Sequence, residues 1–315
     1  MSMSFTSEVK TEIAQNGELK PCCMRAECAA LIKMCSTLNF TSSGMHLTIS
    51  TESAPTAKRI LKLMKELYNV TSELSVLKKM NLKKNNIYVL RIRSRTSEIL
   101  KDLEIMDAGG LRAHPSAKMV SKECCAKAFL AGAFLAGGSV NSPNKANYHL
   151  EIATNDEGLA KFIQKQMEKF YLPAKVIQRR NQSVVYLKAS DKISDFLACA
   201  GAHQSVFEFE DSRIQRDFMN NLTRLDNCEL ANEMKSLAAG KSQCDDIEWI
   251  ENYAGLESLP EKLRNVALLR KEHPEASLVE LCDYYEEDFN EVISKSGMKH
   301  RLSKIKEIAA NYKHA

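Results

Sequence analysis

Apolar and polar residues follow two different spacings early in the chain, and these spacings predict alternating helices and strands. A run of small and apolar residues over 25–34 predicts a buried helix, and the alternation over 45–50 predicts a short strand. The polar segment 51–53 suits the N-terminal cap of an amphipathic helix, whose apolar positions recur at helical spacing: Ala57, Ile60, Leu61, Met64 and Leu67. Two further alternating segments, 70–78 and 87–94, predict a pair of strands.

The same order of elements returns when the sequence is shifted by 102 or 103 residues. Cys22 and Cys23 then fall on Cys124 and Cys125, and segment 47–68 overlays 150–171 with nine identities in 22 ungapped positions. The second copy predicts its helix, strand, cap and strand pair at 126–136, 148–153, 154–156, 174–179 and 184–189. We therefore expect a duplicated α+β fold, with helices on one face of each antiparallel sheet and a pseudo-twofold axis between the two repeats.

The last part of the chain has helical spacing only and predicts three short helices. The first starts at Pro260 and ends before Pro274, and the second opens with a capping box of Ser277 and Glu280. The third covers about 296–311, with its apolar positions turned inward. Three short helices in this order are typical of an all-α helix-turn-helix domain.

Charge is distributed unevenly, although the formal sum of +4 is too small to indicate nucleic-acid binding by itself. Segment 275–291 holds seven acids and no Lys or Arg, whereas 295–315 holds six bases and one acid. A basic helix with a small, polar N-terminal end can approach phosphates and enter a major groove. We expect DNA contacts from Ser277, Ser294, Lys295, Ser296, Gly297, Lys299, His300, Arg301, Lys304 and Lys306. The alternative is a solvated helix face whose bases pair with neighbouring acids.

A second basic segment lies in the predicted hairpin of the first repeat. Residues 78–95 carry seven bases and no acid: Lys78, Lys79, Lys83, Lys84, Arg91, Arg93 and Arg95. Strand alternation puts the three arginines on one face, and the equivalent hairpin of the second repeat carries Lys175, Arg179, Arg180 and Lys188. We expect sequence-tolerant phosphate contacts here. A solubilising sheet face or a protein-binding surface is the alternative.

Composition narrows the class of protein. A chain of 315 residues, 44% of them hydrophobic, can fill two or three domain cores. Its longest apolar run, 128–138, is far shorter than the roughly 20 residues of a spanning helix, and its first residues lack the apolar region of a secretory signal. We expect a soluble cytoplasmic protein, associated with the nucleoid if it binds DNA.

Ten cysteines without such a signal indicate a reducing compartment, where disulfides are rare. Adjacent residues on a helix point about 100° apart, so one vicinal pair cannot easily bind one ion. We expect buried structural thiols, no metal centre and no cofactor, with a redox or metal role as the alternative. We find no grouping of His, acid and Ser that suggests a hydrolytic triad.

The stretch LAGAFLAGG at 130–138 resembles the LAGLIDADG signature of homing endonucleases, and CAALIKMCS at 28–36 is a degenerate first copy. The resemblance implies two helices in contact along a pseudo-twofold axis, with an acid near each helix end that holds a divalent metal over the DNA. The corresponding positions here are Cys35 and Gly137, neither of which offers a hard oxygen ligand. We expect a LAGLIDADG-like scaffold that lacks nuclease activity.

Several motifs in order resemble the WhiA-like family of bacterial regulators over almost the whole chain. They are MSFTSEVK (3–10), KPCC (20–23), RLDNCELAN (224–232), LPEKL (259–263) and SKSGMKHRL (294–302). The resemblance implies a DNA-binding transcriptional regulator involved in cell division and chromosome segregation, which regulates sporulation in some lineages. One departure is segment 284–292, which is longer and more acidic than the family's usual turn.

These observations predict three parts of the chain. We expect a LAGLIDADG-like scaffold over 1–212 with repeats at about 20–110 and 122–205, a helical linker over 213–254 with hinges at Gly240 and Gly255, and a helix-turn-helix domain over 255–315. The expected partner is double-stranded DNA at promoters, with transcription or division proteins as further partners and no membrane. The alternative functions are an interaction scaffold of the division or transcription machinery and a residual metal-dependent endonuclease.

Overall fold

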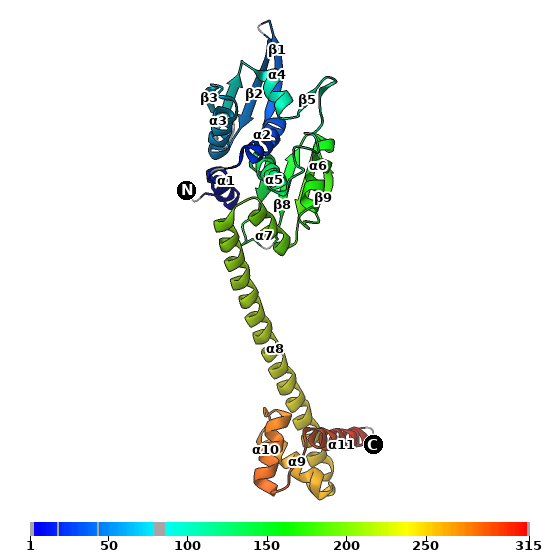
Figure 1. The fold of residues 1–315 in the computed structure, drawn as a ribbon. Coiled ribbons are helices and arrows are strands. Elements are labelled where there is room, and N and C mark those ends of the chain that lie inside the picture. The colour runs from blue at the N-terminus through cyan, green and yellow to red at the C-terminus, as the bar shows by residue number, and fades with distance from the viewer. Residues whose placement is uncertain (1–2, 18, 43, 79–85, 146, 314–315) are drawn as a thin grey trace. The chain divides into compact units, whose positions relative to one another are not determined.

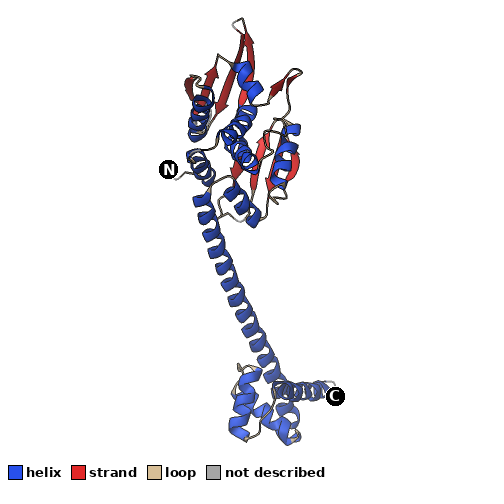
Figure 2. Ribbon diagram, in the orientation of Figure 1, coloured by secondary structure: helices blue, strands red, loops and turns tan. Residues whose placement is uncertain are grey.

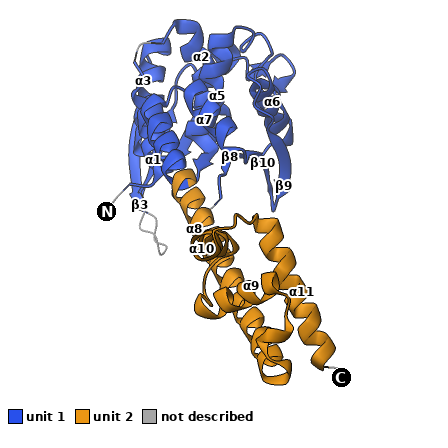
Figure 3. Ribbon diagram, turned by 90° about the horizontal axis from the view of Figure 1, so that it is seen from below, with its two compact units in different colours: residues 1–216 blue, residues 217–315 orange. Residues whose placement is uncertain are grey.

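The structure, a computed structural model, describes 3–17, 19–42, 44–78, 86–145 and 147–313. The chain forms two compact units, residues 1–216 and 217–315 (Figure 3). Unit 1 mixes helices and strands, whereas the described residues of unit 2 form helices only (Figure 2).

Unit 1 contains the same series of elements twice (Figure 1). The first repeat consists of α2 (Pro21–Cys35), β1 (Ser36–Thr41), β2 (Gly44–Thr51), α3 (Ala54–Tyr68), β3 (Glu73–Lys78), β4 (Asn86–Ile92) and α4 (Thr96–Asp102). The second consists of α5 (Glu123–Gly137), β7 (Gly138–Val140), β8 (Leu150–Thr154), α6 (Glu157–Glu168), β9 (Lys175–Arg179), β10 (Gln182–Leu187) and α7 (Ser190–Cys199). The sheet orders, β1-β2-β4-β3 and β7-β8-β10-β9, correspond strand for strand. The duplicated α+β fold is therefore confirmed.

Local sequence explains where the amphipathic helices begin. Ser53 caps α3 by accepting a hydrogen bond from the Thr56 N–H at 3.3 Å, and Asp156 caps α6 by accepting one from the Leu159 N–H at 3.1 Å. Both caps lie in the polar segments that predicted them. Register then places the apolar positions of neighbouring strands opposite each other and turns them toward the helices: Leu47 with Ile92, Ile49 with Leu90, Leu150 with Leu187, and Ile152 with Val185.

Helices α2 and α5 lie side by side between the two sheets (Figure 1). A Cβ atom added to Gly132 of α5 would lie 2.5 Å from the backbone oxygen of Glu27 in α2, so only glycine allows the helices to approach this closely. On another side of α2, the Glu27 carboxylate accepts two hydrogen bonds of 2.8 Å from Arg59 of α3. Both side chains are buried, and this ion pair joins the two helices inside the core.

The sequence did not predict every element of unit 1. Helix α1 (Phe5–Gln15) was missed, although its Thr6 hydroxyl donates to the Val140 oxygen at 2.8 Å and accepts from the Val140 N–H at 3.0 Å. Strand β1 was missed because it is an edge strand with mostly exposed residues, so its apolar alternation is weak. The short hairpin of β5 (Met106–Asp107) and β6 (Gly110–Leu111) connects the repeats.

A single helix, α8 (His203–Ala254), occupies the segment predicted as a hinged linker. Gly240 lies inside this helix, and a Cβ there would be 2.2 Å from the Pro274 oxygen. The predicted hinge at Gly240 is therefore wrong, because this glycine serves close packing instead. Gly255 follows the helix with φ of +76°, a conformation that favours glycine. Neither α8 nor any other helix among the described residues is long and apolar enough to cross a membrane.

Unit 2 packs three short helices against the last turns of α8. After the 3₁₀ turn Leu256–Ser258 come α9 (Glu261–Glu272), α10 (Leu278–Phe289) and α11 (Lys295–Lys313), which confirms the three predicted helices. The capping box is also present, since the Ser277 hydroxyl accepts from the Glu280 N–H at 3.3 Å and the Glu280 carboxylate accepts from the Ser277 N–H at 2.7 Å. The buried core includes Ile247, Ile250, Val266, Leu269, Leu281, Tyr285, Met298, Leu302 and Ile305.

Candidate nucleic-acid interface

The turn before α11 is shorter than the sequence suggested. Segment 284–292 was interpreted as a long acidic turn, but its residues up to Phe289 belong to α10, and Tyr285 is buried in the core. Its acids Glu286, Glu287 and Asp288 occupy exposed positions of the helix, and only Glu291 lies in the turn. Asn290 ends it with φ of 50° and donates its N–H to the Glu286 oxygen at 2.9 Å. The turn proper is 290–294, which is compatible with a helix-turn-helix.

Helix α11 has a buried apolar side and an exposed polar side. Met298, Leu302, Ile305 and Ala309 are buried in the core of unit 2. The opposite side exposes Ser296, Lys299, His300, Ser303 and Lys306. Within the described part of the chain, no ion pair involves Lys299 or Lys306. These two ammonium groups are therefore available to an anionic ligand.

Two other cations of α11 are engaged within the protein. The Arg301 guanidinium lies 3.3 Å from the Glu291 carboxylate and 5.0 Å from the centre of the Tyr285 ring. Lys304 lies 3.8 Å from Glu307 on the same helix. Glu291 also contacts Lys262 at 3.3 Å, and these two cations lower the pKa of its carboxyl group, Lys262 with the larger effect. Arg301 thus holds α11 against α10 rather than facing outward.

The N-terminal end of α11 is built from small residues. The Ser294 hydroxyl accepts the Gly297 N–H at 3.1 Å, which caps the first turn. A Cβ on Gly297 would lie 3.1 Å from the Ile293 side chain, so a larger residue would be crowded here. Lys295 and Ser296 are exposed at this end. Ser277, also predicted to contact DNA, is the N-cap of α10 and not part of α11. Its hydroxyl and N–H are both used in that cap.

The open face of the first sheet carries some of the predicted bases. Arg91 lies on this face opposite Thr48 and Glu73 of the neighbouring strands, and its guanidinium is 3.5 Å from the Ser75 hydroxyl. Arg93 follows β4 and forms an ion pair of 3.0 Å with Glu73. Lys78 is exposed at the end of β3 but pairs with Asn86, so strand alternation puts it on the opposite face of the sheet from Arg91. Lys79, Lys83 and Lys84 lie outside the described residues.

Arg95 does not share the strand face, contrary to the strand alternation that grouped it with the other arginines. It follows the end of β4 with φ of 57° and precedes α4. Its guanidinium donates hydrogen bonds to the Glu98 carboxylate at 2.7 Å and to the backbone carbonyl oxygen of Tyr68 at 2.8 Å. The chain turns at this residue, which ends the alternation of side chains.

The open face of the second sheet has a comparable arrangement. Arg179 lies 3.6 Å from Glu151, which also contacts His149 at 3.0 Å. Lys188 follows β10 with its ammonium 5.5 Å from the centre of the Tyr186 ring, and Arg180 occupies the β9–β10 turn with φ of 58°. Sequence patterns gave no sign of Glu73 and Glu151 as partners of the arginines. Glu73 lies on the strand next to the end of β4, and the Glu151–Arg179 pair spans β10, which separates β8 from β9, so both pairs join residues that are far apart in sequence.

The position that corresponds to the second catalytic acid cannot hold one. A Cβ on Gly137 would lie 2.3 Å from the Ala153 oxygen and 2.8 Å from the end of the Met34 side chain. A backbone oxygen at this distance leaves no room for any side chain. The next residue, Gly138, follows the helix with φ of −79°, a conformation open to any residue, so close packing rather than backbone freedom explains the glycines at this helix end.

The other lost acid position, Cys35, borders an open hollow of about 1020 Å³ beside α1. Lys10 of α1 and Lys58 line it, with Glu52 as its one acid among the described residues. Burial lowers the pKa of Lys10 to about 8, and burial raises the pKa of the Cys35 thiol to about 11. A protonated thiol beside a lysine does not supply the paired carboxylates on which magnesium chemistry depends.

Three protein-family models match the chain in sequence. The WhiA N-terminal LAGLIDADG-like domain matches residues 21–106, the WhiA LAGLIDADG-like domain matches 126–219, and the WhiA C-terminal HTH domain matches 222–309. Together they agree with the duplicated scaffold and the helical C-terminal unit described above.

Similar full-length proteins and structures are also known. "Probable cell division protein WhiA" of Anoxybacillus flavithermus is 44% identical, covering 98% of this chain and 95% of that protein. The protein of the same name from Brevibacillus brevis is 45% identical over 98% and 96%. The crystal structure of full-length DUF199/WhiA from Thermatoga maritima is similar with a TM-score of 0.60 and 27% identity, covering 98% of this chain and 99% of that one.

Proposed function

Since the chain belongs to the WhiA family, we propose that it binds double-stranded DNA and regulates transcription in the service of cell division. The observation that carries this proposal is the exposed face of α11, where Lys299 and Lys306 have no ion pair with any residue that the structure describes and follow a small N-terminal end. The relatives named "Probable cell division protein WhiA" support the cellular role. Chromosome segregation, and sporulation in some lineages, belong to the same proposal.

In this mechanism α11 enters the major groove with its N-terminal end first. Ser296, Lys299 and His300 lie on the first turns and face base edges and nearby phosphates, while Lys306 and Lys295 contact the flanking backbone. Arg301 acts as a positioning residue, because its contacts with Glu291 and Tyr285 fix α11 against α10. The acids of α10 repel phosphates, so they restrict DNA to the basic side of the domain.

The open sheet faces of unit 1 contribute a second, sequence-tolerant contact. Arg91 and Lys188 are the cations most available there, since no ion pair involves them within the described residues. Lys78, on the other side of β3, borders this surface at the strand end. Lys79, Lys83, Lys84, Arg180 and the paired Arg93 and Arg179 extend the proposed surface. Contacts of this kind add affinity and salt dependence but little base specificity.

We further propose that the scaffold has no nuclease activity. Gly137 has no room for a carboxylate, and Cys35 offers a thiol whose pKa is raised by burial. The proposed setting is the cytoplasm, at promoters on the nucleoid. Incubation of the full chain with supercoiled DNA and magnesium should leave the DNA intact. Cleavage that scales with protein through purification would overturn this part of the proposal.

A genome-wide map of DNA bound by the full chain in cells tests the regulatory proposal directly. We expect enrichment at promoters that is lost in the double variant Lys299→Gln/Lys306→Gln and retained in Lys241→Gln, which removes an exposed lysine from α8 instead. Equal enrichment in both variants would contradict a role for α11. If the wild-type chain shows no enrichment at any DNA site but binds a division protein, the interaction-scaffold alternative would be favoured.

A further inference from the structure

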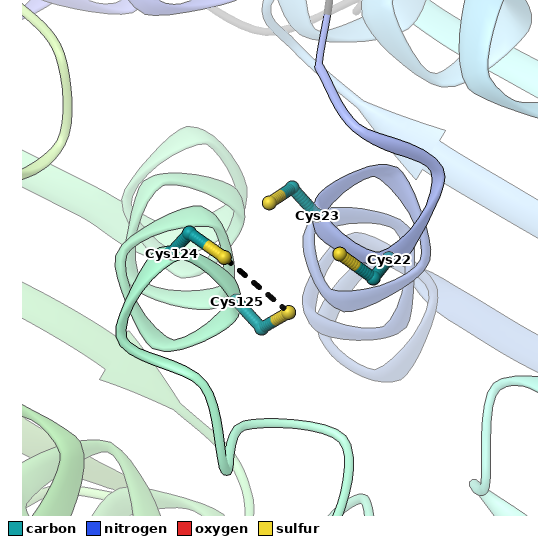
Figure 4. Close-up of side chains that lie close together, drawn as sticks. All are labelled: Cys22, Cys23, Cys124 and Cys125. Carbon is teal, nitrogen blue, oxygen red and sulfur yellow. Dashed lines mark hydrogen bonds between the residues drawn. The ribbon is translucent and has the colours of Figure 1, made fainter.

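The four cysteines of the two vicinal pairs meet at one place in unit 1 (Figure 4). Cys22 and Cys23 are the second and third residues of α2, and Cys124 and Cys125 are the second and third residues of α5. Their Sγ atoms all lie within 4.8 Å of one another, and those of Cys124 and Cys125 are 4.0 Å apart. Figure 4 shows the four sulfur atoms in the space between the two helix starts.

This arrangement changes the interpretation of the pairs as buried structural thiols. One vicinal pair cannot easily bind an ion, but the pseudo-twofold axis places the second pair opposite the first. The four residues differ in burial from one another. Cys23 and Cys125 are buried, at 5% and 4% exposed, whereas Cys124 is exposed and Cys22 is half-buried. The cluster therefore combines a closed inner side with access from solvent.

The distances fit a tetrahedral metal better than a disulfide. Four thiolates at the usual Zn–S distance of about 2.3 Å place their sulfur atoms about 3.8 Å apart. The observed separations of up to 4.8 Å exceed this value by no more than about 1 Å, a difference that small side-chain rotations cover. A disulfide requires an S–S distance of about 2.05 Å, so the thiols would need to move considerably further.

The position of the sulfur atoms at two helix starts favours an ion that needs thiolate ligands. Both pairs occupy the first turns of their helices, where the helix dipoles stabilise thiolates. Burial acts in the opposite direction and raises the pKa of Cys125 to about 11, so ion binding has to displace protons from the cluster. A small hollow next to the cluster is lined by Lys118 and Lys122, together with Glu104 and with Arg25, which pairs with Asp102 at 2.8 Å. The two lysines partly offset the net charge of −2 that four thiolates and a divalent ion carry.

We propose that Cys22, Cys23, Cys124 and Cys125 form a tetrathiolate site for Zn²⁺. Four S–Zn bonds form on binding, the protonated thiols release their protons to solvent, and no oxidant or reductant is required. The ion joins the first turns of α2 and α5. It thus cross-links the two repeats at the pseudo-twofold axis, at the end of the helix pair remote from Cys35 and Gly137.

Metal content and a cobalt spectrum test the proposal on the full chain, purified under reducing conditions. We expect one zinc per chain by elemental analysis. Replacement by Co²⁺ should give the thiolate charge-transfer absorption and intense visible bands of a tetrahedral all-sulfur site. Cys124→Ser should reduce metal affinity at least tenfold, and Cys22→Ser/Cys124→Ser should abolish stoichiometric binding. Cys228→Ser, which removes an exposed thiol of α8, is the matched control and should behave as wild type.

A second measurement keeps the test clear of misfolding. Cys124 is exposed, so Cys124→Ser should fold, which circular dichroism verifies. Zinc should raise the melting temperature of metal-free wild type and of Cys228→Ser, but not that of Cys124→Ser at the same concentration. A wild-type chain that retains no metal and shows no cobalt bands overturns the proposal. The proposal is also overturned if the two pairs are joined by a disulfide in protein whose free thiols were blocked by alkylation at cell lysis, so that oxidation during purification is excluded.

Discussion

The exposed face of α11 and the open faces of the two sheets are both basic, but they hold their charges differently. On α11, Lys299 and Lys306 have no acidic partner within the described residues. On the sheets, Arg91 and Lys188 also have no ion pair within the described residues, but Glu73 pairs with Arg93 and Glu151 pairs with Arg179. A cation that already has a partner gains less from a phosphate, because one ion pair replaces another. The number of bases on a surface is therefore a poor measure of its contribution to DNA affinity.

The largest effect is expected from a cation that belongs to neither surface. Arg59→Met leaves the Glu27 carboxylate buried without a partner and should lower the free energy of unfolding of unit 1 by about 3–5 kcal/mol. Chemical denaturation of the full chain measures this, with the exposed Arg91→Met as the control that should change little. If Arg59→Met lowers the free energy of unfolding by less than about 1 kcal/mol, the buried cation stabilises the fold no more than an exposed one does.

The next largest effect is a loss of DNA affinity on removal of the exposed lysines of α11. The double variant Lys299→Gln/Lys306→Gln removes two unpaired charges and should weaken binding to a promoter fragment about 100-fold. The slope of log affinity against log salt should fall by about two, because two fewer counterions are released from the DNA. Fluorescence anisotropy at several salt concentrations measures both quantities. Lys241→Gln should leave affinity and slope unchanged, and an equal loss in that variant would point to net charge alone.

A smaller effect is expected on the sheet side. Arg91→Gln/Lys188→Gln should weaken binding about threefold to tenfold and equally for all DNA sequences, because these side chains face phosphates rather than base edges. Competition between promoter and random duplexes separates this outcome from a loss of specificity. Unchanged affinity and salt slope would remove the sheets from the DNA-binding surface and favour a protein partner for them.

The smallest expected effect is a gain in DNA affinity, opposite in sign to the losses above. Glu73→Gln frees Arg93 from its ion pair and should strengthen DNA binding about twofold, with a slightly steeper salt dependence. Arg93→Gln in the wild-type background should weaken binding by no more than this amount. If Glu73→Gln leaves the affinity unchanged while Arg93→Gln lowers it, Arg93 reaches DNA despite its partner, and the argument from pairing fails.

Much of the fold could be predicted because its signals are local or repeated. Ser53, Asp156 and Ser277 cap helices from within three residues, and the offset of 102 to 103 residues identified the duplication directly. The proposed recognition helix was also found from the spacing of Leu302 and Ile305 with the bases around them. These features depend on short-range geometry, which a sequence displays without knowledge of the tertiary fold.

Features that depend on long-range contacts were missed or misinterpreted. The partners of Arg93 and Arg179 became visible only in the tertiary structure, where the strands of each sheet lie next to one another. Gly240 resembled a hinge until Pro274 was found against it. The pairs at Cys22 and Cys124 were dismissed as ion ligands because each was considered alone. The repeat itself contained the missing signal, since residues related by a pseudo-twofold axis near that axis must also be neighbours in space.

The crowding at Gly137 has a consequence for evolutionary reversibility. A glycine codon can become an aspartate codon by a single base change, yet the new carboxylate would have its Cβ 2.3 Å from the Ala153 oxygen. Restoring an acid at this position therefore requires the strand that carries Ala153 to retreat first, a change with no benefit of its own. A lineage with this helix end therefore has no single-mutation path to a carboxylate at this position.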